Sequence, residues 1–153
     1  MANTYSQIYI QIVFAVRNRN ALIESSWDER LYKYITGIIQ EKGQKVIAIN
    51  GVSDHIHIFI GLKPDCRLSD LVREVKKAST VFINGEKLSK FKFNWQAGFG
   101  AFSYSKSHID NVYNYVLNQK EHHKKKTFKE EYIEFLEKYD ISYDNKYVFD
   151  WGE

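Results

Sequence analysis

Alternating apolar and polar residues predict β-strands at four places along the chain. These stretches are residues 4–16, 45–52, 54–60 and 91–104. One face of the first stretch is wholly apolar, with Ile8, Ile10, Ile12, Phe14 and Val16. The turn between the second and third stretches is so short that we expect a hairpin of antiparallel neighbours. Two glycines interrupt the last stretch, which indicates a bulge or a close backbone approach.

Apolar residues at helical spacing predict the helices. The first begins at a capping box, Ser26-Trp27-Asp28-Glu29, and ends at Gly43. The second begins near Leu68, and its expected buried stripe is Leu71, Val72, Val75, Ala78, Ser79 and Phe82. Residues 106–124 form a third. A further helix follows the capping box that starts at Thr127, with an apolar side of Phe128, Tyr132, Phe135, Leu136 and Tyr139.

The order strand, helix, strand, strand, helix, strand predicts the fold class. It is the order of an α+β ferredoxin-like sandwich, in which an antiparallel sheet carries helices on one face. The other face is then open to a ligand. Since the isoleucines of residues 54–60 should face the helices, we expect the active site on the open face, where the histidines of this strand lie.

Two histidines on one strand are the first candidates for chemistry. The period of two sends His55, His57 and Phe59 to the same face. Two residues along a strand advance about 6.5–7 Å, and imidazoles from such positions can converge on one metal ion. Taken alone, the motif is equally compatible with a half-exposed strand that carries two solvated histidines.

The helix at residues 106–124 presents a tyrosine on a polar face. Its expected packing face is Ile109, Val112, Tyr113, Val116 and Leu117. The opposite face has His108, Asn111, Tyr115, Gln119 and His122. Tyr113 is therefore assigned to the core, and Tyr115 is presented one turn before Gln119. His123 is adjacent to this candidate site or part of the basic end of the helix.

These residues together suggest phosphodiester chemistry. Tyr115 is a candidate nucleophile, and a phenol, mostly protonated at neutral pH, needs an activated electrophile. A divalent ion held by His55, His57 and Gln119 would polarise a phosphodiester. Attack would leave a phosphotyrosine and conserve the bond energy for religation. Mg²⁺ or Mn²⁺ suits such chemistry best, although Zn²⁺ also binds imidazoles.

The charge is divided along the chain. Residues 1–129 carry 20 Lys and Arg against 11 Asp and Glu, whereas residues 130–153 carry 2 against 8. A basic body suits a partner that is a polyanion, since Lys and Arg displace the counterions condensed on phosphates. An ordinary solvated surface is the alternative. The candidate DNA contacts are Arg17, Arg19, Arg73, Lys76, Lys77, Lys120 and Lys124. Lys124 equally suits the negative end of a helix dipole.

Composition suggests a soluble, cytoplasmic protein. Hydrophobic residues make up 44% of the chain and charged residues 27%, as in globular domains. No apolar run approaches the roughly 20 residues of a membrane span, so no membrane partner is expected. The lone cysteine, Cys66, cannot form an internal disulfide, which suits a reducing compartment.

Three motifs in order resemble a known family. They are Asp54-His55-Ile56-His57, the run from Trp95 to Ser103, and Tyr115-x-x-x-Gln119 followed by Glu121-His122-His123. They are similar to those of the small single-tyrosine transposases (TnpA type) of the HUH nuclease superfamily, which mobilise insertion sequences as single-stranded DNA. The resemblance makes residues 1–126 the transposase domain. Residues 127–153 become an acidic helix and tail packed on the same domain or on a dimer partner.

The resemblance implies roles for individual residues. His55 and His57 match the metal-binding pair, Tyr115 the nucleophile that joins a 5′ phosphate, and Gln119 the third metal ligand. It also implies a homodimer, whose tyrosine helices can complete the partner's site, and recognition of DNA hairpins at element ends. Gln11 departs from the pattern, because many relatives have a histidine in the first strand.

The expected function is that of a transposase, which cleaves and joins single-stranded DNA with a divalent metal. One alternative is a domesticated relative that uses the same chemistry on chromosomal repeats. A replication or conjugation nickase is disfavoured because the chain has no helicase or primase region. The alternative outside the enzymes is a hairpin-binding regulator, although a binder has no need of His55, His57, Tyr115 and Gln119 together.

Overall fold

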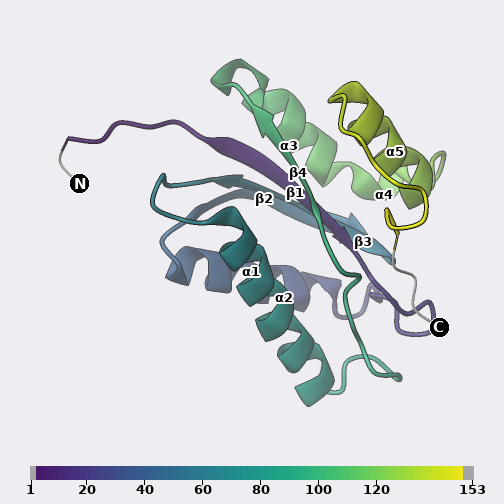
Figure 1. The fold of residues 1–153 in the computed structure, drawn as a ribbon. Helices are drawn as coiled ribbons and strands as arrows, with labels where there is room; N and C mark the ends of the chain where they lie inside the picture. The colour runs from purple at the N-terminus through teal and green to yellow at the C-terminus, as the bar shows by residue number, and fades with distance from the viewer. Residues whose placement is uncertain (1–2, 150–153) are drawn as a thin grey trace.

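A single antiparallel sheet organises the computed structural model, which describes residues 3–149 (Figure 1). Its strands lie in the order β2-β3-β1-β4. Their bounds are Tyr9–Ala15 for β1, Lys45–Val52 for β2, His55–Gly61 for β3 and Gly100–Tyr104 for β4. Every pair of neighbours is antiparallel, and β2 and β3 form the expected hairpin. The α+β class and the antiparallel sheet are confirmed.

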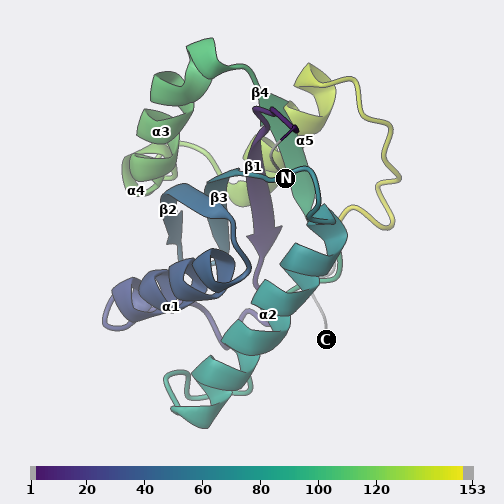
Figure 2. The same ribbon diagram turned by 90° about the vertical axis from the view of Figure 1, so that its left-hand side faces the viewer.

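One face of the sheet carries two long helices, α1 (Asp28–Glu41) and α2 (Leu68–Gly85) (Figures 1 and 2). The alternation of β1 and β3 directs Ile12, Ile56 and Ile58 to this side, where they are at most 2% exposed. They join the largest apolar cluster of the described residues, together with Leu31, Ile35, Leu71 and Val75 from the helices. The isoleucines therefore face the helices, as the sequence predicts.

The other face of the sheet is covered rather than open. Three helices lie over it: α3 (Ile109–Leu117), α4 (Gln119–His122) and α5 (Phe128–Lys138) (Figure 1). Their buried side chains meet apolar groups that β1, β2, β3 and β4 direct to this side, namely Val13, Ala15, Ala48, Phe59 and Phe102. Burying those groups stabilises the covered arrangement, because apolar surface leaves water. The histidines consequently lie inside the molecule.

The first capping box is not formed. Helix α1 begins at Asp28, and its N-terminal cap residue is Trp27, without a side-chain capping bond. Trp27 is 4% exposed, and its indole nitrogen donates to Oε2 of Glu24. Packing of the indole in the core therefore sets the start of the helix, and the prediction of Ser26 as the cap is wrong. The box at Thr127 is formed, with both reciprocal bonds to Glu130.

Residues 91–104 are a strand only at their end. Before β4, Trp95 makes one isolated bridge to Val16. The backbone N–H of Phe93 instead donates to Oδ1 of Asn84, and the Asn84 amide donates back to the Phe93 carbonyl. A side chain of α2 thus satisfies the backbone groups of Phe93, and pairing with the end of β1 is limited to the bonds of Asn94 and Gln96 to Arg17 and Ala15. The longer predicted strand is wrong for this reason.

The predicted helix at residues 106–124 is divided. A 3-10 turn at Lys106–His108 precedes α3, and Asn118 separates α3 from α4. The Asn50 amide on β2 donates to the Leu117 carbonyl at 2.9 Å, which gives this terminal carbonyl a partner outside the helix.

The assignment of Tyr113 to the core is also wrong. Tyr113 is 40% exposed and Leu117 is 45% exposed, whereas Val112 and Val116 are buried. Helix α3 packs on the sheet along a narrow stripe, in which Val112 and Val116 contact Ala48 and Phe59. Residues one position away from this stripe therefore reach the surface.

Among residues 3–149, none of the helices has the length and apolar character that a membrane span requires.

Candidate metal and tyrosine site

His55 and His57 lie on β3, between β1 and β2, and both are 0% exposed. A neighbouring oxygen holds one nitrogen of each ring. Nδ1 of His55 lies 2.8 Å from Oδ1 of Asp54, and Nδ1 of His57 lies 2.6 Å from Oε1 of Gln11. Both oxygens can accept a proton from Nδ1, so these contacts are compatible with a tautomer in which Nδ1 is protonated and Nε2 has a lone pair. That is the tautomer in which Nε2 can ligate a metal.

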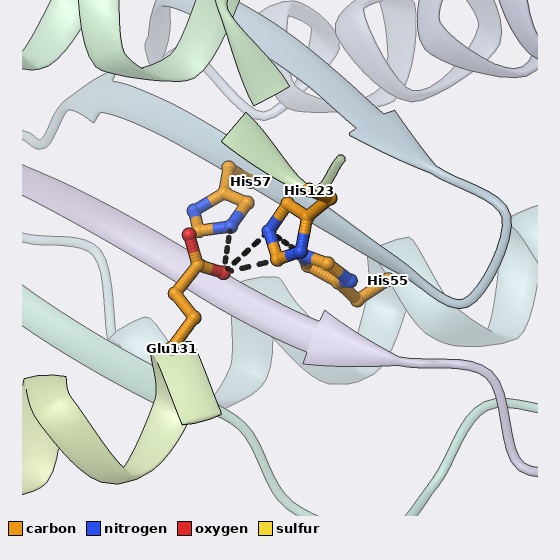
Figure 3. Close-up of side chains that lie close together, drawn as sticks. All are labelled: His55, His57, His123 and Glu131. Carbon is orange, nitrogen blue, oxygen red and sulfur yellow. Dashed lines mark hydrogen bonds and ion pairs between the residues drawn. The ribbon is translucent and has the colours of Figure 1, made fainter. Parts of the chain in front are cut away.

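The Nε2 atoms converge on one carboxylate (Figure 3). Oε1 of Glu131 lies 3.2 Å from Nε2 of His55, 3.0 Å from that of His57 and 3.1 Å from that of His123. The four candidate ligand atoms all lie within 4.8 Å of one another. Imidazole nitrogens and a carboxylate oxygen are donors that divalent metals accept. This cluster can therefore hold a metal ion.

Glu131 was missed from the sequence. It lies on α5, 1% exposed, in a region interpreted as an acidic tail. A signal was available, because position 131 is three residues after Phe128 and four before Phe135, on the apolar stripe of an amphipathic helix. A carboxylate on such a stripe needs a buried partner. His123, noted only as adjacent to the site, is the other unpredicted member of the cluster.

Tyr115 lies beside the cluster, in the same chain. Its hydroxyl donates to Oε2 of Glu131 and lies 3.4 Å from Nε2 of His122. Its ring centroid is 5.7 Å from that of His57. Tyr115 is half-buried, although the sequence places it on a polar helical face. The structure thus brings together the tyrosine and the two strand histidines.

Gln119 is fully buried near this tyrosine. Its Nε2 donates to the Tyr115 carbonyl at 3.2 Å. Its Oε1 has no hydrogen-bond partner among residues 3–149. A buried acceptor without a partner costs about 1–3 kcal/mol, and such groups are rare in native structures. The donor set of the cluster fits a divalent ion, and an amide oxygen without a partner is a type of ligand that such ions accept.

Burial and hydrogen bonds shift the pKa values of the residues in the cluster. Burial lowers the pKa of His57 to about 4. Burial opposes protonation of His55 too, but the hydrogen bonds to Asp54 and Glu131 outweigh it and raise its pKa. Burial alone would raise the pKa of Glu131, yet hydrogen bonds from His123, His55 and His57 lower it far below the usual range. Glu131 is therefore an anion at neutral pH.

The nucleophile candidate is protonated in this setting. Burial raises the pKa of Tyr115, and the charge and hydrogen bond of Glu131 raise it further. A phenol of this kind is a weak nucleophile at neutral pH, so it needs a strongly polarised phosphorus centre.

The predicted basic residues fall into separate groups. Lys120 and Lys124 line a pocket of about 570 Å³ beside the cluster, together with Asp54, His123 and Lys126. Arg73, Lys76 and Lys77 lie on α2, on the opposite side of the sheet (Figure 2). Lys76 donates to the carbonyls of Gln96 and Gly98 and thus takes part in the fold. Arg17 and Arg19 follow β1 and are exposed.

Comparisons with known proteins show the family of the chain. The family model described as "Transposase IS200 like" matches residues 4–119, so the chain belongs to the IS200-like transposase family. A search among curated proteins finds no match. The match stops at Gln119, and His123 and Glu131 lie beyond it.

Two solved structures resemble the chain. A candidate transposase from Deinococcus radiodurans is 17% identical with a TM-score of 0.62, over 76% of this chain and 94% of that one. A REP-associated tyrosine transposase bound to a REP hairpin is 18% identical with a TM-score of 0.56, over 76% of this chain and 68% of that one. At these identities the likeness supports the fold.

Proposed function

We propose that this transposase cleaves and rejoins single-stranded DNA through Tyr115, with a divalent ion bound at His55 and His57. One observation carries the proposal. The Tyr115 hydroxyl and the Nε2 atoms of both histidines contact the same Glu131 carboxylate, within one chain. The proposed nucleophile and the proposed metal ligands are therefore adjacent, as attack on a metal-bound phosphodiester requires.

His55 and His57 would hold the ion, and the unpaired Oε1 of Gln119 is proposed as a further ligand. A bound ion polarises the phosphodiester and stabilises the charge on its oxygens. Mg²⁺ or Mn²⁺ is the proposed ion. Asp54 and Gln11 keep the two rings in the tautomer and orientation that binding needs, because they accept the Nδ1 protons.

Tyr115 forms and later breaks the covalent bond. Its oxygen loses its proton and bonds to phosphorus, the bond from phosphorus to the 3′ oxygen breaks, and this oxygen takes up a proton and leaves as a 3′ hydroxyl. The 5′ end stays attached as a phosphotyrosine. Attack by a 3′ hydroxyl on this intermediate reverses the change and restores a phosphodiester, so strand joining needs no external energy source.

Hairpin-bearing single-stranded DNA is the proposed substrate. The solved REP-associated relative is bound to a REP hairpin, which supports this class of partner. Lys120, Lys124 and Lys126 line the pocket that borders His123, so a DNA backbone there would run beside the cluster. The homodimer, and the division into a transposase domain (1–126) and a C-terminal helix and tail (127–153), remain part of this proposal.

The test is a denaturing gel with hairpin-bearing single strands labelled on the 3′ side of the nick. We expect a labelled band of protein size that requires Mn²⁺ or Mg²⁺ and is lost with EDTA. Tyr115→Phe should abolish the band without weakening hairpin binding. Tyr113→Phe is the matched control, since Tyr113 is exposed on the same helix, and it should leave the band unchanged. A band that persists in Tyr115→Phe would contradict the proposal.

A hairpin-binding protein without catalysis is the second candidate. It is favoured by the burial of His55 and His57 beneath α4 and α5, which restricts access of DNA to the cluster. Tight hairpin binding, with no adduct and no metal requirement, would support it. A domesticated enzyme that acts on chromosomal repeats would also form the Tyr115 adduct in the gel assay. It would do so most readily with strands that contain REP-type hairpins.

A further inference from the structure

Glu131 serves two different partners with its two oxygens. Oε1 faces the Nε2 atoms of His55, His57 and His123 (Figure 3), while Oε2 accepts the Tyr115 hydroxyl. These partners come from β3, α3 and the end of α4, which are otherwise separate parts of the site. Glu131 itself lies on α5, outside the region that the family model matches.

We propose that Glu131 bridges the metal ion and the nucleophile. In this arrangement Oε1 is a metal ligand alongside His55, His57 and His123, and Oε2 positions the Tyr115 hydroxyl beside the ion. The inference rests on the proposed function, because it assigns a positioning role for the same tyrosine. With Glu131 in this role, helix α5 is part of the active site.

The distances suit a shared ion. Ligands about 2.0–2.2 Å from one metal lie roughly 3–3.5 Å from each other. The separations between Oε1 of Glu131 and the three Nε2 atoms are 3.0, 3.1 and 3.2 Å, and the Nε2 atoms of His55 and His123 are also 3.1 Å apart. The widest pair of ligand atoms lies within 4.8 Å, so side-chain shifts that bring this pair to within about 4.4 Å would admit one ion.

Packing of α5 sets the position of Glu131. The Phe135 ring stacks on Phe102 of β4 with centroids 4.6 Å apart, and Phe128 lies 4.5 Å from the His55 ring. Gly100 leaves room for Tyr132, since a Cβ there would lie 2.8 Å from the tyrosine ring. The carboxylate is thus fixed before any ligand arrives, which is how a rigid site is built.

The ligand set also narrows the class of ion. Three imidazoles and one carboxylate suit Zn²⁺ or Co²⁺ best and Mg²⁺ least, because Mg²⁺ prefers oxygen ligands and retains its waters, and Mn²⁺ lies between them. We therefore expect Mn²⁺ to bind more tightly than Mg²⁺. Among the described residues, this cluster is the one group of at least three His, Cys, Asp and Glu with such spacing.

Calorimetric titration of the full chain with Mn²⁺ and with Mg²⁺ tests the ligand role. Glu131→Gln should weaken Mn²⁺ binding by at least about tenfold, and His123→Ala should act in the same direction. Glu137→Gln, the same charge change at an exposed position of α5, is the control and should bind Mn²⁺ normally. Glu131→Asp retains a carboxylate and should recover part of the affinity, which a simple packing defect would not allow.

The gel assay tests the positioning role. Glu131→Gln should slow formation of the Tyr115 adduct at saturating Mn²⁺ while hairpin affinity stays unchanged. Unchanged Mn²⁺ affinity in Glu131→Gln would overturn the ligand assignment. Faster adduct formation in Glu131→Gln would overturn the positioning role and identify the carboxylate as a block. If the unaltered chain forms no adduct, the proposed function fails, and the Mn²⁺ comparison still decides the ligand role.

Discussion

Oε1 of Gln11 lies 2.6 Å from Nδ1 of His57, within the buried side of the sheet. The Gln11 amide is held in turn, because its Nε2 donates to the Tyr104 hydroxyl at 3.0 Å. Gln11 therefore contacts the ring nitrogen that points away from the cluster. Gln11 thereby orients the His57 ring.

Gln11→Leu should weaken Mn²⁺ binding by about 10- to 100-fold, because loss of an outer hydrogen bond frees the ring and its tautomer. It should also lower the free energy of unfolding by about 1–3 kcal/mol, since Nδ1 of His57 becomes a buried donor without a partner. Calorimetry and urea unfolding measure the two effects. Gln7→Leu, at an exposed position before β1, should change neither.

Gln119→Leu should lower the Mn²⁺ affinity with little change in the free energy of unfolding. Replacing Gln119 removes a buried acceptor that has no partner among the described residues, together with one bond of 3.2 Å to the Tyr115 carbonyl. These effects oppose each other, so we expect the free energy of unfolding to change by less than about 1 kcal/mol. The Mn²⁺ affinity should fall. Equal Mn²⁺ affinities in both proteins would remove Gln119 from the ligand set.

The lysines at the pocket should govern the salt dependence of DNA binding. Changing Lys124 and Lys126 to alanine should reduce the slope of log K against log salt by about 0.7 for each lost phosphate contact on single strands. The double variant Arg73→Ala, Lys77→Ala is the comparison, because it removes the same charge from α2, across the sheet from this pocket. A larger loss of slope in the α2 variant would place the DNA on the opposite face.

Gly100→Ala should displace α5 without altering a proposed ligand. The added Cβ would lie 2.8 Å from the Tyr132 ring, so overpacking should lower the free energy of unfolding by about 1–3 kcal/mol. Because Tyr132 adjoins Glu131, the Mn²⁺ affinity should fall as well. Gly37→Ala on α1, where the added Cβ would meet nothing within 4 Å, is the control and should be stabilising. Normal Mn²⁺ binding by a destabilised Gly100→Ala protein would argue against a role for α5.

Several features could be predicted because their causes are local. The alternation of residues 54–60 determines which side His55 and Ile56 face, and this depends on backbone geometry alone. The capping box at Thr127 also formed as predicted, since its bonds join residues three apart. The box at Ser26 did not form, because burial of Trp27 in the core outweighs a local preference.

The sequence by itself determined the order of strands and helices, the face that carries the two histidines, and the motif that links them to Tyr115. Tertiary structure decided what covers that face. Glu131 is 74 residues from His57 along the chain, and their contact depends on how α5 packs against Phe102 and Gly100. No short-range period encodes such a contact, because it arises from apolar burial between distant segments.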